Sequence, residues 1–264
     1  MKDIKELKII DLFLLDMDGT IYLGENLFDG SLDFINTIIK KNKKYIFMTN
    51  NSSKNKFDYV NKLKRLGIPA SSENIFTSGM AMGMYLNTNY PNKRVYLAGT
   101  KALEDELKNN YHINLVDDDA DVVVFGFDTE LTYEKLLKVT RFVDEGKPFL
   151  ATNPDLVCPI ENKKYIPDCG SMCILIENAT GKKPTYIGKP SPYMIDLLSE
   201  TNKIDKKRIA VIGDRVYTDI ASGYNAGVLT ICVLSGEATM DTINNSDIKP
   251  DFIFDSVKDL IDKI

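Results

Sequence analysis

Two aspartates one residue apart follow an apolar run near the N-terminus, in the stretch LLDMDGTIYLG (14–24). If that run is a strand, Asp16 and Asp18 point to the same side, because side chains alternate along an extended chain. Two carboxylates so close repel each other, and a Mg²⁺ ion would relieve the repulsion, since hard cations prefer oxygen ligands. Gly19 would let the backbone approach such a ligand closely. A local turn or helix cap built on Asp and Gly is the competing interpretation.

A second polar stretch, TNNSS (49–53), comes directly after the apolar residues YIFM. Backbone N–H groups at the start of a helix form a ready anion site, and the side chains of Thr49, Asn50 and Asn51 would add to it. The competing interpretation is purely structural, with one of the two serines capping the helix that follows.

A lysine lies in a proline-rich turn, in YIGKPSP (186–192). Pro190 and Pro192 restrict the backbone, Ser191 is placed to cap a helix, and Pro192 suits the first helical position. Most lysines are solvated surface charges, but Lys189 on so stiff a loop beside an anion site would neutralise phosphoryl oxygens.

Two further aspartates lie in VIGDRVYTD (211–219). Asp214 ends a very apolar stretch, and a carboxylate at the end of a buried strand suits a metal ligand. Asp219 opens the next helical pattern, where the helix dipole alone would favour an acidic residue. We therefore assign Asp214 to the predicted metal site and leave the roles of Asp219 and Arg215 open.

Strand and helix patterns alternate along the whole chain, which predicts an α/β fold with a mostly parallel, Rossmann-like sheet covered by helices. The outer parts of the chain predict strands at 12–16, 44–50, 208–214 and 229–234, helices at 31–42, 56–67 and 217–227, and a final strand and helix in 251–264. The middle predicts strands at 93–99, 120–128 and 147–153 and a helix at 171–181. In open α/β sheets ligands bind at the carboxyl ends of the strands, so we expect the four polar stretches to converge there.

The number of predicted strands indicates more than one domain. Roughly nine or ten strands are many for one open sheet. We favour a second domain of roughly a hundred residues, inserted near residue 80 and returning near residue 183. With 264 residues, 44% of them apolar, the chain is long enough to bury a sizeable core.

The overall composition argues against several classes of protein. The net charge is −5, with 33 basic and 38 acidic residues, whereas a nucleic-acid-binding protein usually has a basic excess. The N-terminus lacks the apolar segment of a signal peptide, and no stretch approaches the ~20 apolar residues of a membrane helix. We therefore expect a cytoplasmic protein that binds neither nucleic acid nor membrane.

The four cysteines are predicted to be reduced thiols rather than a disulfide framework, since the chain is long and lacks a secretion signal. Cys169 and Cys173 are four residues apart and would share a helix face. Zinc is the competing interpretation there, but the single histidine, His112, cannot complete a Cys/His set nearby.

Together and in this order, the four polar stretches resemble the motifs of the haloacid dehalogenase superfamily. DMDGT, the Thr of TNN, the Lys of GKP and the GDxxxxD pattern of GDRVYTD match its four motifs, and the resemblance runs nearly the whole length. TNPD (152–155), CGSMC (169–173) and GKPSP (188–192) are similar, more narrowly, to the NagD-like, 4-nitrophenylphosphatase-type branch. The resemblance implies a phosphatase with a haloacid dehalogenase-like core and an inserted α/β cap.

The resemblance also implies the roles of the aspartates. Asp16 would attack phosphorus and form an aspartyl-phosphate. Asp18 would protonate the leaving alkoxide and then deprotonate the attacking water. The Mg²⁺ ion would be held by Asp16, by Asp214 and by Asp18 through its backbone carbonyl.

The phosphoryl group would be bound by the two remaining motifs. The resemblance implies that Thr49, with the backbone around Asn50 and Asn51, grips the phosphoryl oxygens. Lys189 would neutralise charge on the phosphate and on the attacking carboxylate. This chemistry needs no histidine, which agrees with a chain that has only one.

The position of the insertion separates this chain from relatives with other reactions. Hexose phosphomutases of the superfamily carry their cap between the first two motifs, but only 28 residues lie between Thr20 and Thr49. The 137 residues between Asn51 and Lys189 leave room for a cap, as in the NagD-like branch. The resemblance thus implies a catalytic core at 1–80 and 183–264 and a cap at 81–182.

The cap would choose the substrate. Its loop from Asn153 to Ser171 contains the candidate substrate-binding residues Cys158, Gly170 and Ser171. Gly170 and Ser171 stand at a predicted helix start, where N–H groups meet a polar ligand or where Ser171 merely caps the helix. The branch implies nucleoside monophosphates, small sugar or polyol phosphates, phosphoglycolate and pyridoxal phosphate as candidate substrates.

Two alternatives stay open at this point. The chain could be a catalytically silent protein that keeps affinity for Mg²⁺ and phosphate, or a phosphotransferase, which the cap position disfavours. The expected partner is a small phosphorylated metabolite, and self-association into a homodimer is left open.

Overall fold

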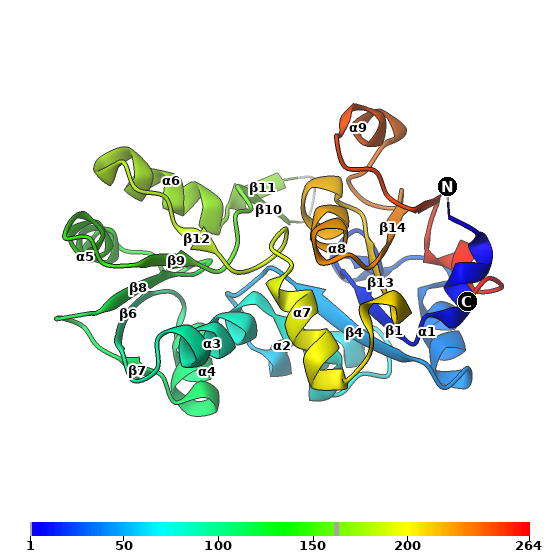
Figure 1. Cartoon of the computed structure of the whole chain (residues 1–264), viewed down its shortest axis with the longest axis horizontal. Helices are drawn as coiled ribbons and strands as arrows, with labels where there is room; N and C mark the ends of the chain where they lie inside the picture. Colours follow the sequence, from blue (N-terminus) through cyan, green and yellow to red (C-terminus); the bar gives the residue numbers. More distant parts are fainter. Residues whose placement is uncertain (1, 161–163) are drawn as a thin grey trace. The chain divides into compact units, whose positions relative to one another are not determined.

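The computed structural model describes residues 2–160 and 164–264 and divides the chain into two compact units (Figure 1). The first unit consists of Met1–Thr49, Lys56–Phe76 and Lys189–Ile264, and the second of Asn50–Asn55 and Thr77–Gly188. The predicted loop at 153–171 falls partly outside the described residues, since it includes 161–163. None of the described helices combines the length and the apolar character that a membrane crossing requires.

A six-stranded sheet forms the centre of the first unit. Its strands are, in order across the sheet, β15 (Phe252–Phe254), β14 (Leu229–Val233), β13 (Ile209–Gly213), β1 (Leu12–Leu15), β4 (Lys44–Thr49) and β5 (Ile75–Thr77). β1 runs parallel to both β13 and β4, with Leu14 opposite Val211 on one side and Ile46 on the other. The carboxyl ends of these three strands therefore lie next to one another.

The first unit folds around residues that the strands present on both faces. Every residue of β1 is buried, as expected of a parallel strand with both faces covered. The ring of Phe13 meets that of Phe34 from α1 edge-on, with the ring centroids 6.1 Å apart. The helices of this unit are α1 (Ser31–Lys40), α2 (Lys56–Arg65), α7 (Tyr193–Asn202), α8 (Ala221–Ala226) and α9 (Met240–Asn245), with 3₁₀ helices at Ile4–Ile9, Ser72–Asn74, Lys206–Arg208 and Val257–Leu260.

The second unit has a sheet and a hydrophobic core of its own. The sheet order is β12 (Thr185–Tyr186), β9 (Phe149–Ala151), β8 (Val122–Phe125), β6 (Arg94–Ala98) and β7 (Asn114–Leu115), all paired in parallel. Its helices are α3 (Ser78–Asn89), α4 (Lys101–Tyr111), α5 (Tyr133–Asp144) and α6 (Cys169–Thr180). Two antiparallel hairpins complete the chain, β2 (Tyr22–Leu23) with β3 (Asn26–Leu27) in the first unit and β10 (Val157–Ile160) with β11 (Lys164–Pro167) in the second.

The predicted mostly parallel α/β architecture is confirmed, and the differences concern short elements. The helix expected at 217–227 is a π-helical turn, Val216–Ile220, followed by the short α8. The helix expected at the C-terminus is only a 3₁₀ helix, Val257–Leu260. The two-residue strands β2, β3, β7 and β12 were not predicted, because so short a stretch shows no hydrophobic period. That the two units act as catalytic core and cap stays a prediction.

Candidate active site

Three neighbouring strand ends carry the polar side chains of the candidate site. Asp16 follows β1, Asp214 follows β13, and Thr49 is the last residue of β4. The backbone N–H of Asp16 donates to the carbonyl of Ile212, 2.9 Å away, so the parallel pairing extends to the first aspartate. The sheet therefore brings together residues that are up to 198 positions apart in the sequence.

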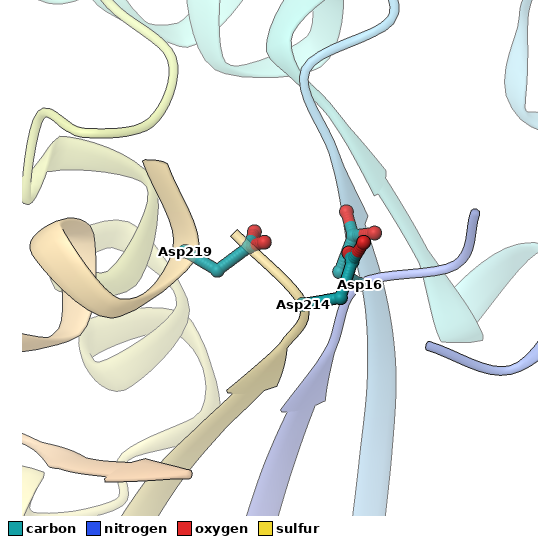
Figure 2. A group of neighbouring side chains, drawn as sticks. All are labelled: Asp16, Asp214 and Asp219. Carbon is teal, nitrogen blue, oxygen red and sulfur yellow. The ribbon is translucent and has the colours of Figure 1, made fainter. Parts of the chain in front are cut away.

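Three carboxylates form a cluster at this edge of the sheet. One oxygen each of Asp16, Asp214 and Asp219 lies within 4.8 Å of the others, and Figure 2 shows the three side chains converging. Asp214 and Asp219 are almost fully buried. Burial, together with the charges of Asp16 and Asp219, raises the pKa of Asp214 to about 8. Without a compensating cation, this group of negative charges is unfavourable.

Lys189 supplies one compensating charge. Its Nζ donates to Asp16 Oδ1 at 2.7 Å, to Asp219 Oδ1 at 2.5 Å and to the carbonyl of Met48 at 3.1 Å. Burial alone would lower the pKa of Lys189, but the two carboxylates outweigh it and raise the pKa above its usual value. The ammonium group is therefore fixed in its charged form beside Asp16.

Asp219 is best explained as the residue that holds Lys189. One of its oxygens accepts from Lys189, and the other accepts from the backbone N–H of Arg215 at 3.2 Å. Burial raises the pKa of Asp219 to about 6, and the charge of Lys189 opposes this rise. These two contacts fix the Asp219 carboxylate between the ammonium of Lys189 and the backbone of Arg215.

Asp16 and Asp214 fit the hard cation that was predicted. Asp214 Oδ2 accepts from the N–H of Glu237 at 2.7 Å, and Asp214 Oδ1 lies 3.5 Å from the hydroxyl of Thr20. All atoms of the cluster that could bind a metal are carboxylate oxygens. Mg²⁺ prefers oxygen ligands, whereas softer metals prefer nitrogen or sulfur. The side chain of Asp18 is outside the cluster, so only its backbone carbonyl stays a candidate ligand.

The carboxylate of Asp18 has different neighbours. It is 48% exposed, and its Oδ1 lies 3.8 Å from Nζ of Lys62 on α2. The same ammonium lies 3.9 Å from the ring centroid of Tyr22, a fully buried residue that forms a β-bridge with Asp18. Asp18 is thus solvent-accessible and next to a positive charge, whereas Asp16 is directed into the cluster.

The loop after β4 is fixed by its own side chains. Asn51 Oδ1 accepts from the backbone N–H and the hydroxyl of Ser53, at 2.9 and 2.7 Å. The hydroxyl of Ser52 is 3.0 Å from that of Thr152, and α2 begins only at Lys56. The interpretation that one of the two serines caps this helix is therefore wrong, because both hydroxyls have other partners.

The loop before α7 also differs in detail from the expectation. α7 begins at Tyr193, one residue later than predicted. Pro192 therefore occupies the N-cap position, without a side-chain cap, instead of the first helical position. The hydroxyl of Ser191 accepts from the N–H of Tyr193 at 3.3 Å. The two prolines still restrict the backbone directly after Lys189.

The three predicted substrate-binding residues of the cap lie in the second unit. Cys158 is half-buried on β10. The hydroxyl of Ser171 donates to the carbonyl of Leu156 at 2.6 Å, and the N–H of Gly170 donates to the carbonyl of Asp155 at 2.8 Å. α6 begins at Cys169, so Gly170 and Ser171 lie in its first turn, and these contacts give both residues a structural role.

Two glycines shape the wall around Asp214. A Cβ at Gly236 would lie 2.0 Å from Asp214 Oδ2, and one at Gly19 would lie 2.2 Å from the same atom. Gly19 also has a φ of +92°, which L side chains rarely adopt. No side chain fits at either position while Asp214 stays in place.

Replacing Gly236 with alanine should therefore displace the Asp214 carboxylate and lower kcat/KM by about tenfold or more. The variant should also need a higher Mg²⁺ concentration for half-maximal activity. Gly67→Ala is the control, because its backbone is strained at φ +80° while nothing lies within 4 Å of the added carbon. If both variants lose stability and activity alike, the glycine does not act through Asp214.

Sequence reasoning missed the residues that support the cluster. Asp219 was left without a role, because a carboxylate at a helix start is common. The Nε of Arg215 lies 2.9 Å from the carboxylate of Glu237, which is also the residue whose N–H binds Asp214. The spacing GDxxxxD was a usable signal for Asp219, whereas nothing near Glu237 in the sequence marks it.

Comparisons with known proteins point to one family of hydrolases. A family model described as haloacid dehalogenase-like hydrolase matches residues 13–112, and a second model of the same kind of hydrolase matches residues 186–260. The acid sugar phosphatase of Staphylococcus haemolyticus is 35% identical over 92% of this chain and 92% of its own length.

Solved structures give the same result. The 4-nitrophenylphosphatase of Thermotoga maritima has a TM-score of 0.93 and 40% identity, over 97% of this chain and 98% of its own. NagD of Escherichia coli K-12 has a TM-score of 0.87 and 30% identity, over 94% of this chain and 97% of its own. Both matches extend over nearly the entire length of each protein.

Proposed function

The chain belongs to the haloacid dehalogenase superfamily, in its NagD-like, 4-nitrophenylphosphatase-type branch, and on this premise we propose a Mg²⁺-dependent phosphatase that acts through an aspartyl-phosphate. Its class is phosphoric monoester hydrolase. One observation supports the mechanism above the others: Asp16 Oδ1 is held 2.7 Å from the buried Nζ of Lys189. A nucleophile fixed beside a permanent positive charge can approach a phosphate dianion.

In the first step an oxygen of Asp16 attacks phosphorus and the bond from phosphorus to the ester oxygen breaks. Lys189 stays beside both the attacking carboxylate and the phosphoryl oxygens, and it offsets the negative charge that gathers there. The carboxyl group of Asp18 donates its proton to the leaving oxygen. The exposure of Asp18 supports this assignment, because an acid must reach the part of the substrate that leaves.

In the second step water attacks the aspartyl-phosphate. Asp18, now a carboxylate, accepts a proton from that water, and phosphate leaves with the carboxylate of Asp16 restored. The ion, held by Asp16, Asp214 and the carbonyl of Asp18, would supply further positive charge next to the phosphoryl oxygens. Thr49, Asn50 and Asn51 are the proposed binders of those oxygens.

Sugar and polyol phosphates are the substrate class that we favour. The curated relatives are named acid sugar phosphatases, and the solved relative from Thermotoga maritima is named 4-nitrophenylphosphatase. Phosphate release from a panel of sugar phosphates, nucleoside monophosphates, phosphoglycolate and pyridoxal phosphate, with 4-nitrophenyl phosphate as the reference, tests the assignment. No turnover of any of them with Mg²⁺ would favour the catalytically silent alternative, and transfer to an added alcohol instead of water would favour a phosphotransferase.

The second unit is proposed as the cap that selects the substrate. Its part of the predicted specificity loop includes the hairpin of β10 and β11, which carries Cys158. The cytoplasmic location and the homodimer that was left open stay predictions.

Replacing Cys158 with phenylalanine should change the ratio of kcat/KM between two phosphate esters by about tenfold or more, because a larger side chain packed against the core of the second unit would shift the hairpin that we propose to meet the leaving group. Val157→Phe is the matched control, since neighbouring residues of a strand point to opposite faces. Lys189→Ala should instead lower kcat/KM for every ester together. A uniform decrease in the Cys158 variant would mean that this hairpin does not select the substrate.

A further inference from the structure

A chain of hydrogen-bonded side chains is buried in the second unit and includes Asn50. The Nδ2 of Asn50 donates to Asp155 Oδ2 at 2.6 Å, and the Nδ2 of Asn153 donates to the same oxygen at 2.8 Å. Asn153 also donates to Asp168 Oδ1 at 3.0 Å. All four residues are at most 9% exposed. Two amides thus share one carboxylate oxygen away from solvent.

A second set of contacts fixes the same loop two residues later. The hydroxyl of Ser52 is 3.0 Å from that of Thr152 and accepts from the N–H of Phe127 at 2.9 Å. The hydroxyl of Thr152 donates to Asn153 Oδ1 at 2.9 Å. Residues 50 and 52 are therefore both tied to the TNPD stretch (152–155), about a hundred residues further along the chain.

The oxygen of the Asn50 amide lies close to the backbone of Gly188. A Cβ on Gly188 would lie 2.6 Å from Asn50 Oδ1, and the N–H of Gly188 donates to the carbonyl of Thr152 at 2.8 Å. The nitrogen of the Asn50 amide thus donates to Asp155, and its oxygen lies where a side chain at position 188 would collide with it. Asn50 follows Thr49 in the chain, and Gly188 precedes Lys189.

We propose that Asp155 is a positioning residue for phosphate binding, which acts by holding the side chain of Asn50 and with it the backbone of loop 50–52. This inference rests on the proposed function, in which that loop receives the phosphoryl oxygens. An anion is bound well only if the N–H groups are already directed at it, and a buried hydrogen bond to a charged acceptor supplies that order. Asn153 and Asp155 then serve every substrate, whereas the sequence alone placed them in a loop that selects among substrates.

Asp168 provides a matched control for the experiment. Like Asp155, it is a buried aspartate that accepts from Asn153, but it also accepts from the N–H of Cys169 at the start of α6, whereas Asp155 accepts from Asn50. A purely structural role of the network predicts that alanine at either position has the same consequences. A positioning role predicts that only the loss of Asp155 weakens phosphate binding.

The experiment measures the Kd of inorganic phosphate by calorimetry in the presence of Mg²⁺, together with Tm. We expect Asp155→Ala to raise the Kd by about tenfold or more, and Asp168→Ala by less than about threefold. KM should rise by the same factor for alkyl and aryl esters in Asp155→Ala. Equal effects of the two substitutions, or an unchanged Kd in Asp155→Ala, would overturn the inference.

A double-mutant cycle tests whether Asp155 acts through Asn50. In the background of Asn50→Ala, the substitution Asp155→Ala should raise the Kd no further, whereas independent effects would multiply and would overturn the inference. If Asp155→Ala does not fold, Asp155→Asn replaces it in the cycle, because it removes the charge and keeps an acceptor oxygen. Failure of the proposed function would appear separately, as a wild-type protein that binds phosphate but releases none from any ester.

Discussion

Asp16→Asn should lower kcat for phosphate esters by more than about a hundredfold, a loss of at least ~3 kcal/mol of transition-state stabilisation. The amide has the shape of the carboxylate and keeps an oxygen for Lys189, which lies 2.7 Å from Asp16 Oδ1. Its remaining atom is an uncharged nitrogen, which cannot attack phosphorus. The measurement is steady-state phosphate release from 4-nitrophenyl phosphate with Mg²⁺.

The control for this variant lies at the other end of the same strand. Asp11 precedes β1 and pairs with Arg208 at 2.7 Å near the surface, so Asp11→Asn removes a charge without touching the cluster and should leave kcat unchanged. The Tm of both variants shows whether they are folded. Covalent catalysis by Asp16 would be wrong if Asp16→Asn kept more than about a hundredth of the wild-type kcat.

The sequence predicted best those parts of the candidate site that directly follow a continuous apolar stretch. Asp16 and Asp214 follow such strands, and parallel pairing then brings their carboxylates to one edge of a sheet. The order of the motifs linked them to the superfamily. An apolar stretch and the aspartate that follows it are both visible in a short segment of sequence, so they were sufficient to predict Asp16 and Asp214.

The parts that were missed depend on contacts between residues far apart in the sequence. Asn50 and Asp155 share a hydrogen bond across 105 positions, and no pattern around either residue shows it. Arg215 and Glu237 likewise form an ion pair although β14 lies between them in the sequence. Short elements such as the π-helical turn Val216–Ile220 are equally hard to predict, because a stretch of five residues shows no clear hydrophobic period.

The other large effect expected is that of the metal. Activity should vanish in excess chelator and return when Mg²⁺ is added beyond the chelator. Three carboxylates lie within 4.8 Å of one another, and burial, together with the charges of Asp16 and Asp219, raises the pKa of Asp214 to about 8. A divalent cation held by Asp16 and Asp214 would reduce this repulsion and would add positive charge next to the phosphoryl oxygens.

We also expect Mg²⁺ to cause a thermal shift without any substrate. Mg²⁺ binds the folded protein, so it should raise Tm, and the rise should be larger above about pH 8 than well below it. The sign follows from the raised pKa of Asp214: in the absence of metal the folded state holds a proton that the unfolded state has lost, so its stability falls as the pH increases toward 8. The metal must displace that proton at low pH, and it finds the carboxylate already charged at high pH. Asp214→Asn should abolish both the thermal shift and the activity, whereas full activity of the wild type in excess chelator would contradict the metal site altogether.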